Sequence, residues 1–248
     1  MTHSSLTLAN GKSLPPDAAA TSLLESASSL SISSEDNAAA RAWTDRRLNP
    51  YRRRAIEQHA GESFLDVGCG NGQYVFRLAD QYQSAGLDIQ SYPSWEQSPE
   101  QFRIGDATAL PYDSESFDTV ISFETLEHVP DPGAALREFH RVCRRNIIFS
   151  VPNCELPPEL AASRLTYFHY TDQSHVNFFT RESLRETVEA NGFHVKDIRL
   201  INPCPTRPLL TALFGLPKRL TGLLNRFVRQ DVLQMTILVV AEKVEQSS

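Results

Sequence analysis

The stretch Ser63–Val75 reads SFLDVGCGNGQYV and decides the fold. Its first part, Phe64–Val67, is a short apolar run bounded by turn residues, which predicts a buried strand. Gly68, Gly70 and Gly72 follow at alternate positions, and apolar residues then recur at helical spacing. A strand, a glycine turn and a helix open the βαβ unit of nucleotide-binding sheets. The glycines permit positive φ angles and let a ligand lie against the main chain.

The glycine spacing alone does not prove a ligand site. G-x-G-x-G differs from the G-x-G-x-x-G of dinucleotide-binding enzymes, and a tight turn without a ligand has the same sequence. The acids downstream favour a binding edge, because Asp66, Asp88 and Asp106 stand at the ends of three successive predicted strands. One such acid is commonly a turn cap, but strand ends in an open α/β sheet are where ligands bind.

Strands and helices alternate along the rest of the chain. We expect strands at 64–67, 85–89, 102–106, 117–123, 147–151, 195–201 and 235–241, and helices at 50–60, 74–82, 132–143 and 180–191. Such alternation predicts an α/β fold with a mostly parallel sheet and helices on both faces.

Composition excludes several classes of protein. The 248 residues suit one α/β domain with additions, and the net charge of -6 gives no general basic surface for nucleic acid. No apolar run reaches membrane-spanning length, and the start of the chain lacks the pattern of a signal peptide. The four cysteines lack paired metal spacing and indicate reduced thiols in a cytoplasmic protein: Cys69, Cys143, Cys154 and Cys204.

Three further segments remain to be interpreted, and two of them allow more than one role. Residues 1–36 are rich in Ser and Ala and predict a disordered tail before a domain at 37–248. Asn49-Pro50 predicts the start of a helix whose arginines, Arg52–Arg54, form a solvated face or contact an anionic substrate; we favour the solvated face. Residues 203–230 form a basic amphipathic insertion, which covers an apolar substrate, lies on a membrane surface as a peripheral contact, or packs on the sheet.

Six segments together resemble class I S-adenosylmethionine (SAM)-dependent methyltransferases over about residues 45–243. They are LDVGCGNGQYV, GLDI, GDATALPY, FDTVISFETLEHVPDP, IIFSVPN and TILVVAEK. The resemblance implies a Rossmann-like sheet of seven strands with the last strand antiparallel, and SAM as cofactor. It also implies a set of cofactor-binding residues: Asp66, Gly68, Gly70, Gly72, Asp88, Ile89, Asp106, Ala107 and Phe123. Within this set, Asp88 would hold the ribose and Asp106 the adenine amine.

Glu124-x-x-Glu127-His128 follows the fourth predicted strand. In a helical turn, residues i, i+3 and i+4 share one face, so these side chains would converge at the cofactor site. With His175 they could hold one divalent cation, Mg²⁺, Mn²⁺ or Zn²⁺. This pattern is similar to that of metal-dependent small-RNA 3′-terminal 2′-O-methyltransferases and of ubiquinone-pathway O-methyltransferases. Alternatively, Glu124 borders the cofactor, Glu127 pairs locally and His128 acts without a metal.

We therefore predict methyl transfer from SAM to a hydroxyl of a small molecule, which can be apolar. His128 is the preferred base and His175 the second candidate, with Glu124 at the sulfonium end. The acceptor would be lined by residues near His175: Tyr167, His169, Tyr170 and Phe178. The rival functions are RNA 3′-terminal methylation, and SAM binding without transfer by a protein that acts through a partner. The glycine spacing disfavours a nicotinamide oxidoreductase.

Overall fold

The computed structural model describes residues 48–163, 166–204 and 233–244, together with positions 206, 210, 211, 215 and 220. All of these residues belong to one unit of the chain, Arg47–Ser248. The predicted tail at 1–36 lies outside the described residues, as does most of the basic insertion at 203–230, so both remain predictions. Within the described ranges, no helix combines the length and apolarity needed to cross a membrane.

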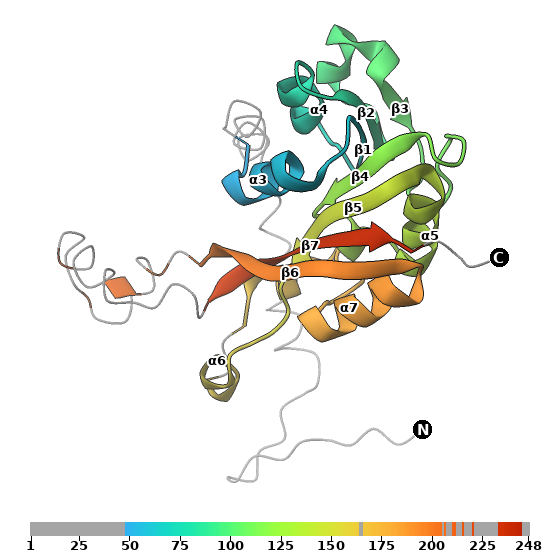
Figure 1. The fold of residues 1–248 in the computed structure, drawn as a ribbon. Coiled ribbons are helices and arrows are strands. Elements are labelled where there is room, and N and C mark those ends of the chain that lie inside the picture. Colours follow the sequence, from blue (N-terminus) through green and yellow to red (C-terminus); the bar gives the residue numbers. More distant parts are fainter. Residues whose placement is uncertain are drawn as a thin grey trace, which may run out of the picture. The chain divides into compact units, whose positions relative to one another are not determined.

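Seven strands form one sheet in the order β3-β2-β1-β4-β5-β7-β6 (Figure 1). Their bounds are β1 Ser63–Val67, β2 Gln83–Asp88, β3 Phe102–Ile104, β4 Phe117–Phe123, β5 Cys143–Pro152, β6 Phe193–Pro203 and β7 Gln234–Lys243. Strand β7 pairs antiparallel with both β5 and β6, whereas the pairs among β1 to β5 are parallel. The predicted seven-stranded, mostly parallel sheet with an antiparallel last strand is confirmed.

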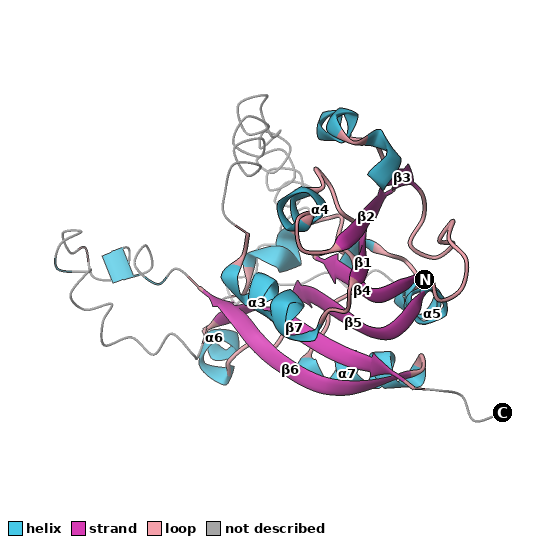
Figure 2. Cartoon of the chain, turned by 45° about the horizontal axis from the view of Figure 1, so that its top comes forward, coloured by secondary structure: helices cyan, strands magenta, loops and turns pink. Residues whose placement is uncertain are grey.

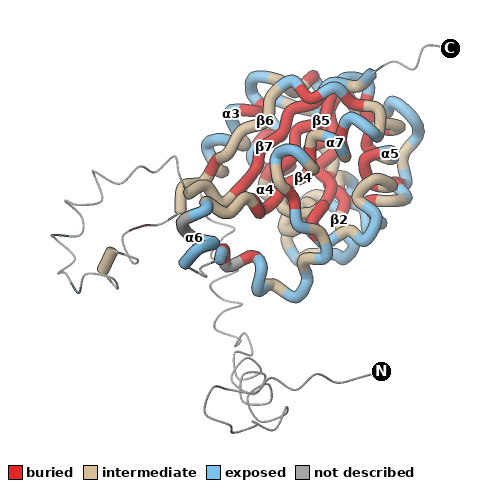
Figure 3. The backbone as a smooth tube through the Cα atoms, turned by 90° about the horizontal axis from the view of Figure 1, so that it is seen from below, coloured by how far each residue is buried: buried red, intermediate tan, exposed pale blue. Residues whose placement is uncertain are grey.

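Helices cover both faces of the sheet (Figure 2). One core contains side chains from α3 (Pro50–His59) and α4 (Gln73–Leu78), and the other contains side chains from α5 (Pro132–Val142) and α7 (Arg181–Ala190). Successive residues of β7 alternate between these two cores, as a period of two requires. Strands β4, β5 and β7 are therefore buried along most of their length (Figure 3). The short elements are α6 Pro158–Ala162, η1 Pro93–Gln97, η2 Pro99–Gln101, η3 Leu126–His128 and η4 Phe168–Thr171.

The helix ends follow the sequence signals. The Asn49 side chain accepts hydrogen bonds from the backbone N–H groups of Tyr51 and Arg52, and Pro50 takes the first helical position of α3. Thr180 and Ser183 form a reciprocal capping box at the start of α7. Both predicted helix starts are confirmed, whereas α4 ends at Leu78, four residues before the predicted end.

Several strand bounds differ from the prediction. Strand β2 ends at Asp88 and β3 at Ile104, so Ile89 and Asp106 lie in the loops that follow. Strand β5 begins at Cys143, although the sequence predicts a turn there. The polar residues at its start join the sheet because β4 supplies partners: Arg144 Nη1 donates to Asp118 Oδ1 at 2.6 Å, and Thr119 Oγ1 donates to Asn146 Oδ1 at 2.7 Å.

The glycine loop lies where the strand order reverses, because β1 pairs with β2 on one side and β4 on the other. The backbone N–H groups of Gly68 and Cys69 both donate to the Leu87 carbonyl, at 2.8 and 3.1 Å. From the opposite side, Trp95 Nε1 donates to the Gly70 carbonyl at 2.8 Å. These bonds fix the loop at the carboxyl ends of β1 and β2, which is where such sheets bind ligands.

We predict that Gly68→Ala destabilises the domain more than Gly70→Ala. Both glycines have positive φ, 76° and 51°, but a Cβ at Gly68 would lie 2.1 Å from Thr125 Oγ1, whereas none of the described atoms lies within 4 Å of a Cβ at Gly70. The left-handed backbone costs about 1–2 kcal/mol in each variant, and steric overlap adds about 1–3 kcal/mol at Gly68 alone. Urea unfolding of both variants measures the difference. Equal losses of unfolding free energy would contradict the predicted clash.

Candidate functional site

A pocket of about 410 Å³ opens at the carboxyl ends of β1, β2 and β4. It is lined by the glycine loop, the end of β2, the turn after β3 and the segment around η3. Six of the predicted cofactor residues line it: Gly68, Gly70, Asp88, Ile89, Asp106 and Ala107. Asp66, Gly72 and Phe123 lie outside its lining. The structure thus brings the residues predicted for ribose and adenine to one pocket.

Asp88 connects two walls of this pocket. Its Oδ2 accepts the Gly70 N–H at 2.8 Å, which orients the carboxylate toward the glycine loop. The next residue, Ile89, has 76% of its surface exposed although it is apolar and lines the pocket. A ligand seated there would cover Ile89 and meet the remaining acceptor capacity of Asp88, since an ionised carboxylate has about four acceptor positions.

Asp106 makes the local bonds of a turn cap as well as lining the pocket. Its Oδ1 accepts from both the backbone N–H and the hydroxyl of Thr108, at 2.8 and 2.7 Å. These two hydrogen bonds lower the pKa of Asp106, so the side chain is an anion at neutral pH. Because both bonds use Oδ1, Oδ2 of Asp106 remains available to a ligand.

Asp66 is buried beneath the glycine loop, with 2% of its surface exposed. Burial raises its pKa to about 8, the negative charge of Asp88 adds to the increase, and the positive charge of Arg52 opposes it. The Asp66 carboxyl is therefore mostly protonated at neutral pH in the protein without ligand. A bound ammonium group would favour its ionised form.

Glu124 does not share a helical face with Glu127 and His128, so the predicted helical turn is wrong. The turn η3 begins only at Leu126, and Glu124 has a left-handed φ of 55°. Its backbone N–H donates to the Ser150 carbonyl at 2.8 Å, and its Oε1 accepts the Ser150 hydroxyl at 2.8 Å. The same oxygen forms an ion pair with Arg52. Glu124 therefore lines the pocket while it is bound from the side of α3 and β5.

For Arg52, the predicted solvated helix face is wrong. Its side chain is 15% exposed, not solvated, and its guanidinium carbon lies 5.1 Å from the centre of the Phe123 ring. The cap at Asn49 predicts the helix but not which of its arginines faces the sheet. The partner, Glu124, lies 72 residues away in the sequence, so no local pattern reveals the pair.

Three of the four predicted metal ligands come together in Glu127, His128 and His175, whose ligand atoms lie within 4.8 Å of one another. We call these three residues the histidine cluster. Both carboxylate oxygens of Glu127 are buried without a hydrogen-bond partner among the described residues. Burial, and then the negative charge of Glu124, raise the pKa of Glu127 to about 8. An unpartnered buried carboxylate next to two imidazoles is a suitable donor set for a divalent cation.

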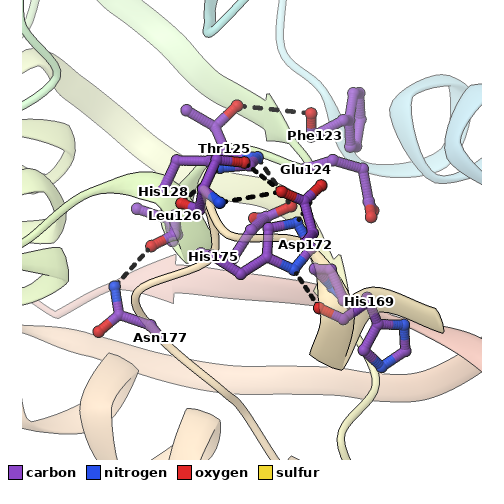
Figure 4. A network of polar contacts seen from close by, with 12 residues as sticks. Phe123, Glu124, Thr125, Leu126, His128, His169, Asp172, His175 and Asn177 are labelled. Atoms are coloured by element: carbon purple, nitrogen blue, oxygen red, sulfur yellow. Dashed lines mark hydrogen bonds and ion pairs between the residues drawn. The ribbon is translucent and has the colours of Figure 1, made fainter. Parts of the chain in front are cut away.

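Backbone carbonyls orient both histidines of the cluster (Figure 4). Nδ1 of His128 lies 3.0 Å from the Ser174 carbonyl oxygen, and Nδ1 of His175 lies 2.9 Å from the His169 carbonyl oxygen. A carbonyl only accepts, so Nδ1 carries a proton in each ring, and Nε2 of the neutral imidazole offers a lone pair. This is the orientation found in metal-ligating histidines, and His128 also lines the pocket.

The residues predicted to line the acceptor lie outside the pocket lining. His169 is buried, and its Nε2 donates to the Asn153 carbonyl at 2.6 Å, which anchors the loop to the end of β5. Tyr167 is also buried. Tyr170 and Phe178 are 37% and 47% exposed and stack on each other with ring centres 5.3 Å apart. Of these four residues, only this aromatic pair therefore offers exposed apolar surface near the histidine cluster.

The chain is similar in sequence to known methyltransferases. The family model of a methyltransferase domain matches residues 40–198. A 27-O-demethylrifamycin SV methyltransferase of Amycolatopsis mediterranei is 34% identical over 97 residues, covering 34% of this chain and 36% of that protein. A ubiquinone biosynthesis O-methyltransferase of Pseudomonas paraeruginosa is 34% identical over 128 residues, covering 43% of this chain and 55% of that protein. The matches thus span between about a third and about half of these relatives' length.

Solved structures share the fold. A SAM-dependent methyltransferase from Archaeoglobus fulgidus superposes with a TM-score of 0.56, covering 78% of this chain and 91% of that chain. The two sequences are 21% identical, so the likeness shows the fold alone.

We predict that Asp88→Ala weakens binding of S-adenosylhomocysteine about 10–100-fold without unfolding the domain, since a charge-assisted hydrogen bond contributes about 1.5–3 kcal/mol. Isothermal titration calorimetry measures the affinity, and thermal unfolding checks the fold. Asp113→Ala is the control, because Asp113 is exposed and outside the pocket lining. Unchanged affinity in Asp88→Ala would remove Asp88 from the cofactor site.

The raised pKa of Asp66 predicts that the free energy of unfolding depends on pH. Because its pKa is raised from 3.8 to about 8 in the folded protein, the folded state holds one proton more than the unfolded chain between these pH values. This proton stabilises the fold at low pH, and its contribution falls by up to about 1.4 kcal/mol per pH unit as the pH rises through this window. Asp66→Asn should therefore gain stability relative to wild type between pH 5 and pH 8 in urea unfolding. Parallel pH profiles, as expected for Asp80→Asn at an exposed position, would contradict the prediction.

Proposed function

The chain belongs to the class I SAM-dependent methyltransferase family, and we propose that it transfers the methyl group of SAM to a hydroxyl of a small molecule. One observation carries the proposal: His128 lines the same pocket as Gly70 and Asp88. A group able to take a proton therefore borders the predicted cofactor site. Most of that site comes from β1, β2 and the loops that follow them.

The chemistry explains why a base is needed there. Methyl transfer from a sulfonium is an in-line displacement, and correct positioning can contribute about 7–11 kcal/mol. A hydroxyl must also lose its proton, to a base or in a metal-bound state. His128 offers an Nε2 lone pair beside the pocket, because its Nδ1 proton is donated to the Ser174 carbonyl. Without a bound cation, we assign His128 as the group that takes the acceptor's proton.

We further propose that the histidine cluster binds one divalent cation, Mg²⁺ or Mn²⁺. The residues present fit such an ion, because both buried oxygens of Glu127 lack a hydrogen-bond partner in the part of the chain that the structure describes, and both neutral histidines present Nε2. With the cation bound, His128 Nε2 would be a ligand and not a base; the cation would instead lower the pKa of the acceptor hydroxyl, whose proton would leave to water. Of the four ligands predicted from the sequence, Glu124 is bound to Arg52 and Ser150 instead.

A small, partly apolar acceptor is consistent with the surroundings. The relatives' names describe a rifamycin and a ubiquinone-pathway O-methyltransferase. The exposed pair Tyr170 and Phe178 stands on the loop that carries His175, and Val176 on the same loop is 54% exposed. These apolar surfaces favour an acceptor with an aromatic or aliphatic part. The net charge of -6 does not favour a nucleic-acid acceptor.

We predict that His128→Ala lowers kcat at least about 100-fold while affinity for S-adenosylhomocysteine changes less than about twofold, as expected for loss of a proton acceptor. The measurement is transfer of a labelled methyl group from SAM to catechol or to the small molecules of a cell extract. His194→Ala is the control, because His194 is exposed on β6. Wild-type turnover in His128→Ala would overturn the assignment of the base. Absence of transfer by the wild-type protein to any small molecule would overturn the proposed function.

A further inference from the structure

Asp172 lies beside His175 in the polar network of Figure 4, although the sequence pattern does not include it. Its Oδ2 is 3.6 Å from His175 Nε2. Because His175 Nδ1 donates to the His169 carbonyl, the neutral ring presents its unprotonated Nε2 to this carboxylate. Two acceptors that face each other need a positive charge between them, which a proton on Nε2 or a bound cation supplies.

The same arrangement recurs at the other histidine. Nε2 of His128 lies 3.8 Å from Oε1 of Glu127, and its Nδ1 is likewise used by a carbonyl, that of Ser174. These two contacts between a carboxylate oxygen and an imidazole nitrogen lie next to each other: the ligand atoms of Glu127, His128 and His175 are within 4.8 Å of one another, and Asp172 borders this set through His175. One cation bound beside the two Nε2 atoms would make both contacts attractive.

Glu124 is held outside the turn of the cluster through one oxygen. Its Oε1 is bound by Arg52 and by the Ser150 hydroxyl, which leaves Oε2 unused by these contacts, and its left-handed backbone separates it from the turn that carries Glu127. Bringing Glu124 to the histidine cluster would break its ion pair with Arg52, whose side chain is mostly buried. Removing one partner from such a pair is costly, because the other charge is left uncompensated.

Asp172, in contrast, is positioned with one oxygen free. Its Oδ1 accepts from the backbone N–H and the hydroxyl of Ser174, at 2.9 and 2.6 Å, while its Oδ2 faces His175. Ser174 thus positions Asp172 with its N–H and hydroxyl, and His128 with its carbonyl. Asp172 is 37% exposed, so its side of the cluster is open to solvent and to an acceptor.

We infer that Asp172, and not Glu124, supplies the second carboxylate that binds the cation or one of its waters. This inference rests on the cation site of the proposed function. Two carboxylates, Asp172 and Glu127, balance the charge of a divalent ion, and two neutral imidazoles complete a mixed oxygen and nitrogen set. The ion would then join the loop before α7 to the turn after β4.

The test is a calorimetric titration of Mn²⁺ into the metal-stripped full chain saturated with S-adenosylhomocysteine. Asp172→Asn and Glu124→Gln form a matched pair, since each removes one negative charge and keeps the side-chain shape. We expect Asp172→Asn to weaken Mn²⁺ binding at least about tenfold and Glu124→Gln to change it less than about twofold. Ser174→Ala, which removes one of the two bonds to Asp172 Oδ1, should weaken it by less than Asp172→Asn. Thermal unfolding of each variant checks that it is folded.

Each outcome separates the inference from the proposed function. If Glu124→Gln loses Mn²⁺ while Asp172→Asn retains it, the inference is overturned and the cation site stands. If the wild-type protein binds no Mn²⁺, both the inference and the cation site fall, while methyl transfer with His128 as a metal-free base remains measurable by label transfer. If Asp172→Asn does not fold, unchanged Mn²⁺ affinity in Ser174→Ala overturns the inference.

Discussion

The site depends on the positive charge of Arg52, which lies among several acidic side chains at the carboxyl ends of the strands. Parallel strands bring their carboxyl ends together, so β1 and β4 place Asp66, Glu124 and Glu127 within electrostatic reach of one another. Arg52 pairs with Glu124 and lowers the pKa of both Asp66 and Glu127, against the larger effect of their burial. Without this guanidinium, three acids would share a partly buried space with no nearby compensation.

The negative charge of the acids that line the pocket is complementary to the net charge of SAM, the methyl donor of the family. SAM carries a sulfonium and an ammonium against one carboxylate, so it brings a net positive charge to a pocket lined by Asp88, Asp106 and Glu124. Low-dielectric walls of one charge sign concentrate ligands of the opposite sign. After transfer, S-adenosylhomocysteine has lost the sulfonium charge and is attracted less. The same acids that we predict to hold the cofactor would thereby favour release of the product.

The sequence predicts this fold well where local patterns carry the information. Short apolar runs locate the strands, and Asn49 and Thr180 identify helix starts, because caps and burial are properties of a few neighbouring residues. Prediction fails where the partner is distant in the sequence. Strand β5 begins four residues early because Asp118 and Thr119 pair with its polar residues. Arg52 is mostly buried because it pairs with Glu124, which directly follows β4.

The position of Glu124 differs from the prediction, and it shows why a motif predicts which residues take part in a site better than it predicts their arrangement. The spacing of Glu124, Glu127 and His128 places them on one face only if the backbone is helical throughout, and a φ of 55° at Glu124 breaks that condition. The histidine cluster is instead assembled by contacts from a distant loop, made by its backbone and by the Asn177 side chain, whose Nδ2 donates to the Leu126 and Val129 carbonyls. The Glu127 carbonyl accepts the N–H groups of Val176 and Asn177, at 2.9 and 3.1 Å, which brings the loop with His175 to the turn after β4. Because these contacts reach main-chain atoms of the turn, the side chains of the motif do not predict them. The sequence around Asp172 likewise gives no indication that this residue lies beside the cluster.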